Sequence, residues 1–460
     1  MEKFHQYSVR LGFSSQEAEK IKSTGLKKFI SNQLSAKNEL PEPAFISDSP
    51  KTSEALRVLR ETLENDDKPD HNINQYLNEK NLNWKAFLVE RYYTTENPLR
   101  EKINLFFQNH FVVTCQSVRF PYWIYLHYKT INDYSTGNYK TLVKEMLYSN
   151  AILKYLDNQQ NKKGSVNENL GRELLELFTL GEGNYTEADI KNAALALAGL
   201  GYGEEKGKYR KAATDNSVKT FLGKSGDFDV IDIVDIIFEQ KSTAAYLSEK
   251  VLKWFFYDNP KKEQITEYAE VLRRSNYELA PFFQTLLEKE CLKNETGTQI
   301  KNPLQWSIQV FKDLNLQPNY QLLVMFLKSQ SMDLYDQPNV KGWKGGQDWM
   351  TSQIFTSRNQ LIDFLIDGNV QMERQFKRRI EKIDGSTFDF KPDLVVKNTK
   401  SAYTIINELV DRTVYETNKQ MDAALDEVLK YDFDPESENA KQSILNVYQY
   451  LAKSPEFQII

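Results

Sequence analysis

Two glutamates, Glu173 and Glu176, lie one helical turn apart in the stretch NENLGRELLELFTLGEGNYTEAD, residues 167–189. Leucines recur at helical spacing on either side of them. At about 100° per residue, Glu173 projects into the apolar face and Glu176 onto its border. A carboxylate removed from water needs a cation, a hydrogen-bond donor or a raised pKa, because its desolvation costs several kcal/mol. The stretch therefore contains a candidate polar site.

Three interpretations of this site are open. A structural one is a buried ion pair of Glu173 with Arg119 or His110. A chemical one is an acid/base pair with unequal pKa values, in which Glu173 is the proton donor and Glu176 the base. The third is a carboxylate metal site of the kind found in helical bundles. The Glu-x-x-His signature of such sites is absent here, so we predict no metal ligands and no cofactor.

Several polar side chains near the pair are candidates for orienting or binding a ligand. His110, in the segment QNHF, is either a neutral core histidine or a base that faces the glutamate helix. The candidates on the helix itself are Asn167, Glu168, Asn169 and Arg172.

The segment KGWKGGQDW, residues 341–349, combines three glycines with two tryptophans. The glycines permit unusual backbone angles, and the indoles of Trp343 and Trp349 offer a stacking platform for a carbohydrate ligand. The alternative is a rigid loop whose indoles fill part of the core.

Familiar catalytic signatures are missing from the sequence. It contains no Gly-x-Ser-x-Gly elbow and no GxxxxGK[ST] phosphate loop, which argues against common serine hydrolases and nucleotide-binding enzymes. Its two cysteines, Cys115 and Cys291, cannot form a disulfide framework.

Composition excludes other classes. The 460 residues are 40% hydrophobic and 12% aromatic, enough to build a large folded core. A net charge of -5 predicts no nucleic-acid partner. No apolar window is long enough for a membrane span, and the first residues lack the apolar core of a signal peptide. We expect a cytoplasmic protein; a periplasmic or exported location stays open if a leader has been removed.

Helical periodicity dominates the chain. We predict a mainly α, large multi-helix globular domain covering residues 1–460, with at most a short β-hairpin near 202–223 and an exposed connection near 37–52. Ser165 and Glu168 fit a capping box for the glutamate helix. A second cap signal, Thr186 with Asp189, precedes an alanine-rich helix that we expect to be core scaffold.

Several ordered motifs resemble one bacterial family, numbered eighteen hundred among the domains of unknown function. Its usual pattern runs Asn-Glu-Asn, Ala-Arg-Glu-Leu-Leu-Glu-Leu, Thr-Leu-Gly, then Tyr-Thr, similar to residues 167–186. The other matching pieces are PLREKINLFFQNHFV from Pro98, YLDNQQNKKG from Tyr155, KTFLG from Lys219, QPNVKGWKGGQDW from Gln337 and SPEF from Ser454. The resemblance implies a largely helical fold without an established activity.

Members of that family are often encoded beside a sulfatase-like family, which suggests a protein partner. Members often carry histidine where this chain has Phe178, and a His-Asp pair in place of Thr214-Asp215, so histidine or metal chemistry transfers poorly to this chain. We therefore carry two hypotheses. The first is an accessory, complex-forming partner of a sulfatase-like protein acting on cell-surface or carbohydrate-related material. The alternative is an acid/base hydrolase or lyase that uses the glutamate pair.

Overall fold

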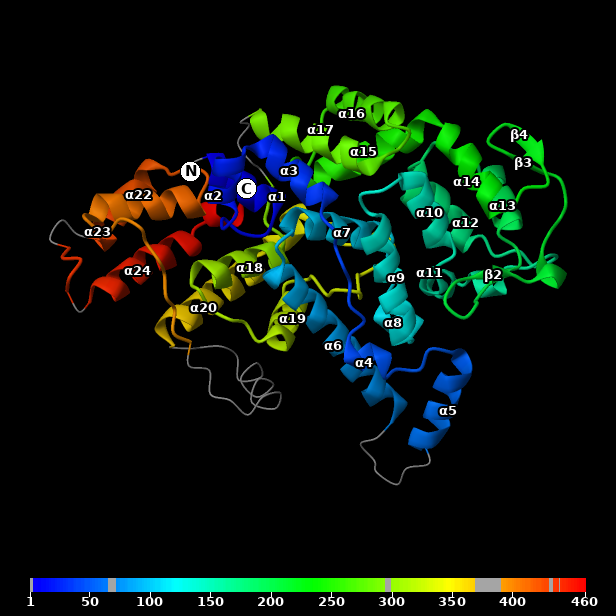
Figure 1. The fold of residues 1–460 in the computed structure, drawn as a ribbon, viewed down its shortest axis with the longest axis horizontal. Helices are drawn as coiled ribbons and strands as arrows, with labels where there is room; N and C mark the ends of the chain where they lie inside the picture. Colours follow the sequence, from blue (N-terminus) through cyan, green and yellow to red (C-terminus); the bar gives the residue numbers. More distant parts are fainter. Residues whose placement is uncertain (1–2, 65–71, 294–298, 369–389, 430–432, 438) are drawn as a thin grey trace.

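The structure is a computed structural model that describes residues 3–64, 72–293, 299–368, 390–429, 433–437 and 439–460. These residues form a mainly helical protein, as the sequence predicts (Figure 1). The helices of the first third are α1 (Lys3–Leu11), α2 (Ala18–Thr24), α3 (Leu26–Ser35), α4 (Ala44–Ser47), α5 (Ser53–Glu64), α6 (Ile73–Thr94), α7 (Pro98–His110), α8 (Cys115–Val118), α9 (Pro121–Tyr134), α10 (Tyr139–Leu147) and α11 (Asn150–Tyr155).

The remaining helices follow in chain order. The middle of the chain forms α12 (Asn169–Glu173), the π-helix η2 (Leu174–Thr179), α13 (Glu187–Ala196), α14 (Val230–Glu239), α15 (Lys241–Phe255), α16 (Lys262–Arg274) and α17 (Leu279–Leu292). The last third forms α18 (Pro303–Asp313), α19 (Tyr320–Ser329), α20 (Ser352–Asp367), α22 (Ala402–Thr413), α23 (Lys419–Val428) and α24 (Ala440–Ala452). Short 3₁₀ turns are η1 (Asn158–Gln160), η3 (Lys211–Ala213), η4 (Gly346–Trp349) and η5 (Glu456–Gln458).

The described strands lie where the sequence predicts β structure, as two small antiparallel pairs. Strand β1 (Leu200–Gly201) pairs with β2 (Lys208–Tyr209), and β3 (Lys219–Phe221) pairs with β4 (Lys224–Gly226). The short strands add no layer to the helical body.

The two chain ends lie near each other, beside α1 and α2 and next to the C-terminal helices α22 and α24 (Figure 1). Helices α12, α13 and α14 and both strand pairs lie at the opposite end of the molecule. Helix α17 packs against α3, and α19 packs against α6, so segments far apart in sequence form the body together.

Helix α7 is buried along nearly its whole length, including the polar side chains of Arg100, Glu101, Lys102 and Asn104. Those polar groups are hydrogen-bonded inside the protein; the Lys102 ammonium, for example, donates to the carbonyl of Arg10 at 2.8 Å. At its last turn, His110 contacts the carbonyl of Phe178 in the glutamate helix, and Asn109 contacts residues Gly342 and Trp343.

The alanine-rich helix α13 is core scaffold, as predicted. Its Ala193, Ala194 and Ala196 are at most 2% exposed, and the predicted Thr186–Asp189 capping box is present. Helix α12 packs against it through Gly171, where an added Cβ would lie 3.0 Å from the backbone nitrogen of Ala194. The absence of side chains at this crossing lets the two backbones approach closely.

We expect Gly171→Ala to lower the stability of the protein by roughly 1–3 kcal/mol, because the new methyl group meets backbone atoms that cannot move aside. Its measurement is the shift of the urea unfolding midpoint. The matched control is Gly137→Ala, whose nearest contact at 3.4 Å is ordinary. An unchanged midpoint for Gly171→Ala would contradict the close approach.

The predicted exposed connection near 37–52 contains the one-turn helix α4 and two buried side chains, Ile46 and Ser49; most of its other residues are exposed or half-exposed. The organisation as one domain stays a prediction. Among the residues that the structure describes, no helix combines the length and apolar character needed to cross a bilayer.

Candidate functional site

The glutamate helix begins at Asn169, and the predicted Ser165–Glu168 capping box is wrong. The side-chain oxygen of Asn167 accepts the backbone N–H of Asn169 at 3.0 Å. Ser165 is instead tied into a tight turn, where its backbone exchanges hydrogen bonds with Lys162. The local turn therefore holds Ser165 away from the helix end that it was expected to cap.

Beyond Glu173 the helix widens into a π-helical turn over Leu174–Thr179. The N–H of Leu180 donates to the carbonyl of Leu175, five residues back, at 2.9 Å. The wider turn changes which side chains face the core. Thr179, which a regular α-helix places toward solvent, is fully buried, and its hydroxyl donates to the carbonyl of Leu174 at 2.5 Å. Such π turns occur frequently at functional sites.

Glu173 is half-buried, as its place in the apolar face predicts. No hydrogen bond or ion pair from the described residues reaches its carboxyl group. Burial is the largest effect on the pKa of Glu173 and raises it. The charge of Glu176 raises this pKa further, whereas Lys341 and Arg172 lower it. The predicted ion pair with Arg119 is wrong, because the Arg119 guanidinium donates to the side chain of Asn74 at 2.7 Å.

Glu176 has the partners that Glu173 lacks. The ammonium of Lys341 lies 3.3 Å from its carboxylate, and the Tyr185 hydroxyl donates to it at 3.2 Å. The Glu176 side chain is 20% exposed, so solvent reaches it. The two glutamates thus occupy different environments: one carboxylate is paired with a cation, and its neighbour is partly buried without one.

His110 lies behind the glutamate helix, in the core, with 2% exposure. Its Nε2 lies 3.0 Å from the Tyr139 hydroxyl and 3.2 Å from the carbonyl of Phe178. Burial lowers its pKa strongly, so the ring is neutral at physiological pH. His110 therefore contacts the backbone of the π-helical turn and does not meet the carboxylates, an arrangement that supports the core-histidine alternative.

The other polar candidates on the helix lie at its N-terminal end. Arg172 pairs with Glu187 at 3.1 Å and with Glu168 at 3.4 Å. Asn167 caps the helix, and Asn169 is exposed. This group is a surface ion-pair cluster with one local cap, and it binds the helix start to α13.

The loop of residues 341–349 packs against the end of α7. The side-chain oxygen of Asn109 accepts the N–H of Trp343 at 2.8 Å, and Lys341 reaches Glu176 from the same loop. Trp343 and Trp349 are 5% and 6% exposed. Their rings pack inside the protein in this conformation, as the core-filling alternative describes; stacking on a sugar stays a prediction.

A family model described as Protein of unknown function (DUF1800) matches residues 7–459 of the chain. The protein belongs to the DUF1800 family. No curated protein and no solved structure matches the chain.

The motifs by which the chain resembles DUF1800 proteins meet in space. His110 of QNHF contacts Phe178 of the glutamate helix, Lys341 of the tryptophan loop pairs with Glu176, and the charge of Glu173 acts on Tyr155 of YLDNQQNKKG. Three other parts of this DUF1800 chain therefore interact with the glutamate helix or its carboxylates.

Phe178 lies in the apolar core behind the glutamates. The Phe178 ring lies 5.2 Å from Phe111 and 6.3 Å from His110, centroid to centroid. Across the described ranges, no three His, Cys, Asp or Glu side chains gather closely enough to hold a metal ion.

A cavity of about 560 Å³ is lined by Tyr155, on which the charge of Glu173 acts, and by Trp343. Its wall also contains Thr114, Ser117, Gln337 and the charged side chains of Lys328, Asp333 and Asp336, and neither glutamate belongs to it. Tyr155, Tyr185 and Lys341 had no role in the sequence-based site. All three lie inside quoted motifs: Tyr155 opens YLDNQQNKKG, Tyr185 lies in the stretch 167–189, and Lys341 opens KGWKGGQDW.

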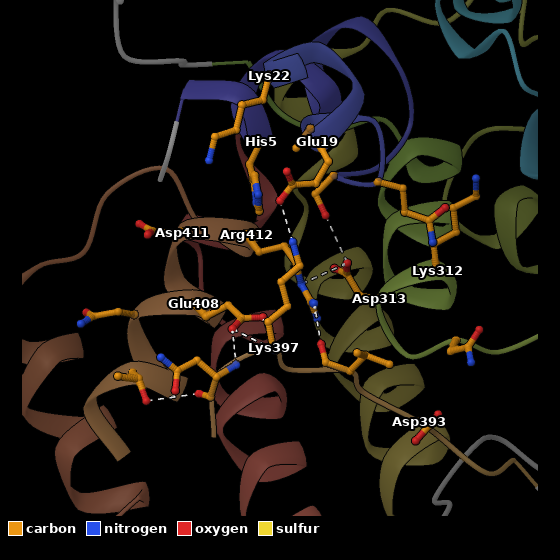
Figure 2. A pocket seen from close by; sticks show the side chains of 18 residues that line it. His5, Glu19, Lys22, Lys312, Asp313, Asp393, Lys397, Glu408, Asp411 and Arg412 are labelled. Carbon is orange, nitrogen blue, oxygen red and sulfur yellow. Dashed lines mark hydrogen bonds and ion pairs between the residues drawn. The ribbon is translucent and has the colours of Figure 1, made fainter. Parts of the chain in front are cut away.

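A second crevice, of about 700 Å³, lies between the N-terminal helices, the end of α18 and the C-terminal segment (Figure 2). Ser15 and Tyr448 donate to the buried Asp313, whose pKa is raised by burial. Lys397 pairs with Glu19 at 2.6 Å. These contacts join the two chain ends, which sequence patterns did not predict because the partners lie hundreds of residues apart.

Proposed function

We propose that this DUF1800 protein is an acid/base hydrolase or lyase acting on a polar polymer, with Glu173 as proton donor and Glu176 as base. The observation that carries the proposal is the difference between the two carboxyl environments. Efficient acid/base pairs hold one group protonated and the other ionised near working pH, and the surroundings set which is which. Here burial favours the protonated form of Glu173, whereas the Glu176 carboxylate lies 3.3 Å from the ammonium of Lys341.

The surroundings support a polar substrate. The cavity that Tyr155 lines presents hydroxyl groups from Thr114, Ser117 and Tyr155 and the amide of Gln337, next to the charged side chains of Lys328, Asp333 and Asp336. Such groups exchange hydrogen bonds with the hydroxyls of a carbohydrate. The edge of Trp343 contributes an apolar surface to the same wall.

We expect Glu173→Gln to reduce turnover by at least about 100-fold, because glutamine cannot deliver a proton. The measurement is the release of reducing ends or unsaturated products from a panel of neutral and acidic polysaccharides. Glu168→Gln, on the same helix but paired with Arg172 at the surface, is the matched control and should keep its rate. Equal activity of Glu173→Gln and the unchanged protein would refute the assignment. It would also be refuted if the unchanged protein released no product from any polysaccharide of the panel.

The same variant has a stability signature that needs no substrate. A carboxyl group whose folded pKa is raised binds protons more tightly in the folded state, so it lowers stability as pH rises from the unfolded pKa through the folded one. Glu173→Gln should therefore be more stable than the unchanged protein at pH 7, and the difference should vanish well below pH 4. Thermal unfolding across this range measures it; a variant less stable at pH 7 would indicate a structural role for Glu173.

The complex-forming role beside a sulfatase-like protein rests on family resemblance. Among the described residues, the exposed large apolar side chains are spread over different elements. They are Val58, Val218, Ile231, Leu292, Val395 and Tyr403. A docking face is usually a contiguous apolar patch, so this distribution does not favour the role. The geometry favours the acid/base proposal.

A further inference from the structure

A third cavity, of about 470 Å³, lies on the other side of the tryptophan loop, between the end of α15, the end of α7 and residues 299–305. Lys341, which pairs with Glu176, belongs to its wall, and Trp343 lines both this cavity and the one that contains Tyr155. Four lysines and two aspartates line it, so its ionisable groups are mainly cationic.

Lys250 is the lysine of this cavity whose charge has no counterion among the described residues. Lys253 pairs with Glu249 at 2.6 Å, Lys344 with Asp348 at 3.2 Å, and Lys341 with Glu176. The ammonium of Lys250 instead lies 5.2 Å from the ring centre of Tyr246. Burial, with a smaller effect of Lys253, lowers its pKa to about 8, so the group still carries a proton at pH 7.

Two indole N–H groups in the same wall also lack acceptors. The Nε1 atoms of Trp254 and Trp343 are buried and form no hydrogen bond with the described residues. Trp84, Trp123 and Trp306 share this feature, but they lie in the core and line none of the three cavities described above. A buried donor without an acceptor destabilises the protein, and a ligand oxygen that accepts from it would remove that cost.

The acidic residues of the cavity do not satisfy these donors. Asp348 is held by Lys344, and Asp258 lies on the exposed rim. The exposed amides of Asn259 and Gln347 complete the rim, and amides of this kind bind hydroxyl groups.

We propose that this cavity binds the oxyanion of a polyhydroxyl ligand, a sugar bearing a carboxylate or a phosphate, with Lys250 as its charge partner and the N–H groups of Trp254 and Trp343 as donors. Charge-assisted bonds to an oxyanion are about twice as strong as neutral ones, so the oxyanion supplies most of the selectivity. The proposal does not depend on catalysis by the glutamate pair. Because Lys341 borders both places, a polymer bound at the glutamates would extend an acidic unit into this cavity.

The test is the titration of the full chain with glucuronate, glucose 6-phosphate and glucose, followed by tryptophan fluorescence and calorimetry. We expect saturable binding of at least one acidic sugar and much weaker binding of glucose. The stronger of the two acidic probes identifies the oxyanion as carboxylate or phosphate. Equal binding of glucose, or no binding of either acidic sugar, would overturn the proposal.

Lys250→Met should weaken binding of the acidic sugar by about tenfold, the loss of one charge-assisted contact. Lys241→Met, at the exposed start of the same helix, is the matched control and should leave affinity unchanged. Thermal unfolding establishes that both variants are folded. If Lys250→Met does not fold, Trp254→Phe replaces it, since it removes one donor and keeps the charge. Unchanged affinity in the folded variant would overturn the assignment.

Repeating the titration in Glu173→Gln separates this inference from the proposed function. Binding retained in that variant supports the cavity whether or not the protein turns over a polysaccharide. Binding lost in that variant would place the sugar at the glutamates and overturn the assignment of this cavity.

Discussion

Replacing Glu101 by alanine is expected to lower the free energy of unfolding by roughly 3–5 kcal/mol, the loss typical of breaking a buried ion pair. The Glu101 side chain is 0% exposed and lies 2.6 Å from the guanidinium of Arg91. It also accepts hydrogen bonds from Tyr128, Asn38 and Asn104, at 2.9, 3.0 and 3.2 Å. Alanine would remove the carboxylate that pairs with Arg91 and accepts from these three donors.

The urea unfolding midpoint and the thermal midpoint measure this loss. Glu90→Ala, at an exposed position of α6, is the control and should change stability by less than about 0.5 kcal/mol. Arg91→Ala should be nearly as damaging as Glu101→Ala, since it leaves the opposite charge buried. The double variant should lose less than the sum of the two, because both single changes break one interaction. Additive losses would show that the two residues are not coupled.

Gly342→Ala is expected to lower stability by roughly 2–5 kcal/mol and to release the tryptophan loop from α7. Gly342 has a φ of +85°, which an alanine adopts only with strain. An added Cβ would also lie 2.8 Å from the backbone oxygen of Asn109 and still closer to its side chain. The Asn109–Trp343 hydrogen bond would then break, and with it the position of Lys341 beside Glu176.

Thermal unfolding and the rate of tryptic cleavage after Lys341 and Lys344 measure this effect. Gly183→Ala is the matched control: its φ is +83°, but nothing lies within 4 Å of the added Cβ. It reports the backbone strain alone, roughly 1–2 kcal/mol. Equal losses in the two variants would mean that the contact with Asn109 does not hold the loop.

Local patterns were sufficient for most secondary structure. Helical spacing of apolar residues predicts the helices, and the Thr186–Asp189 signal predicts the start of α13 correctly. The Ser165–Glu168 signal failed because a turn with Lys162 competes for Ser165. The π-helical turn at Leu174–Thr179 was not predicted, because projecting the residues at a constant angle assumes a regular α-helix over the whole segment.

The sequence by itself determined that Glu173 would be partly withdrawn from water, because that depends only on its position among leucines of the same helix. The motifs in the sequence also indicated the family to which the protein belongs. Which groups meet the two glutamates was decided by tertiary structure alone. Lys341 reaches Glu176 and Arg119 turns away to Asn74 because packing of separate helices sets those distances, and no local pattern contains them.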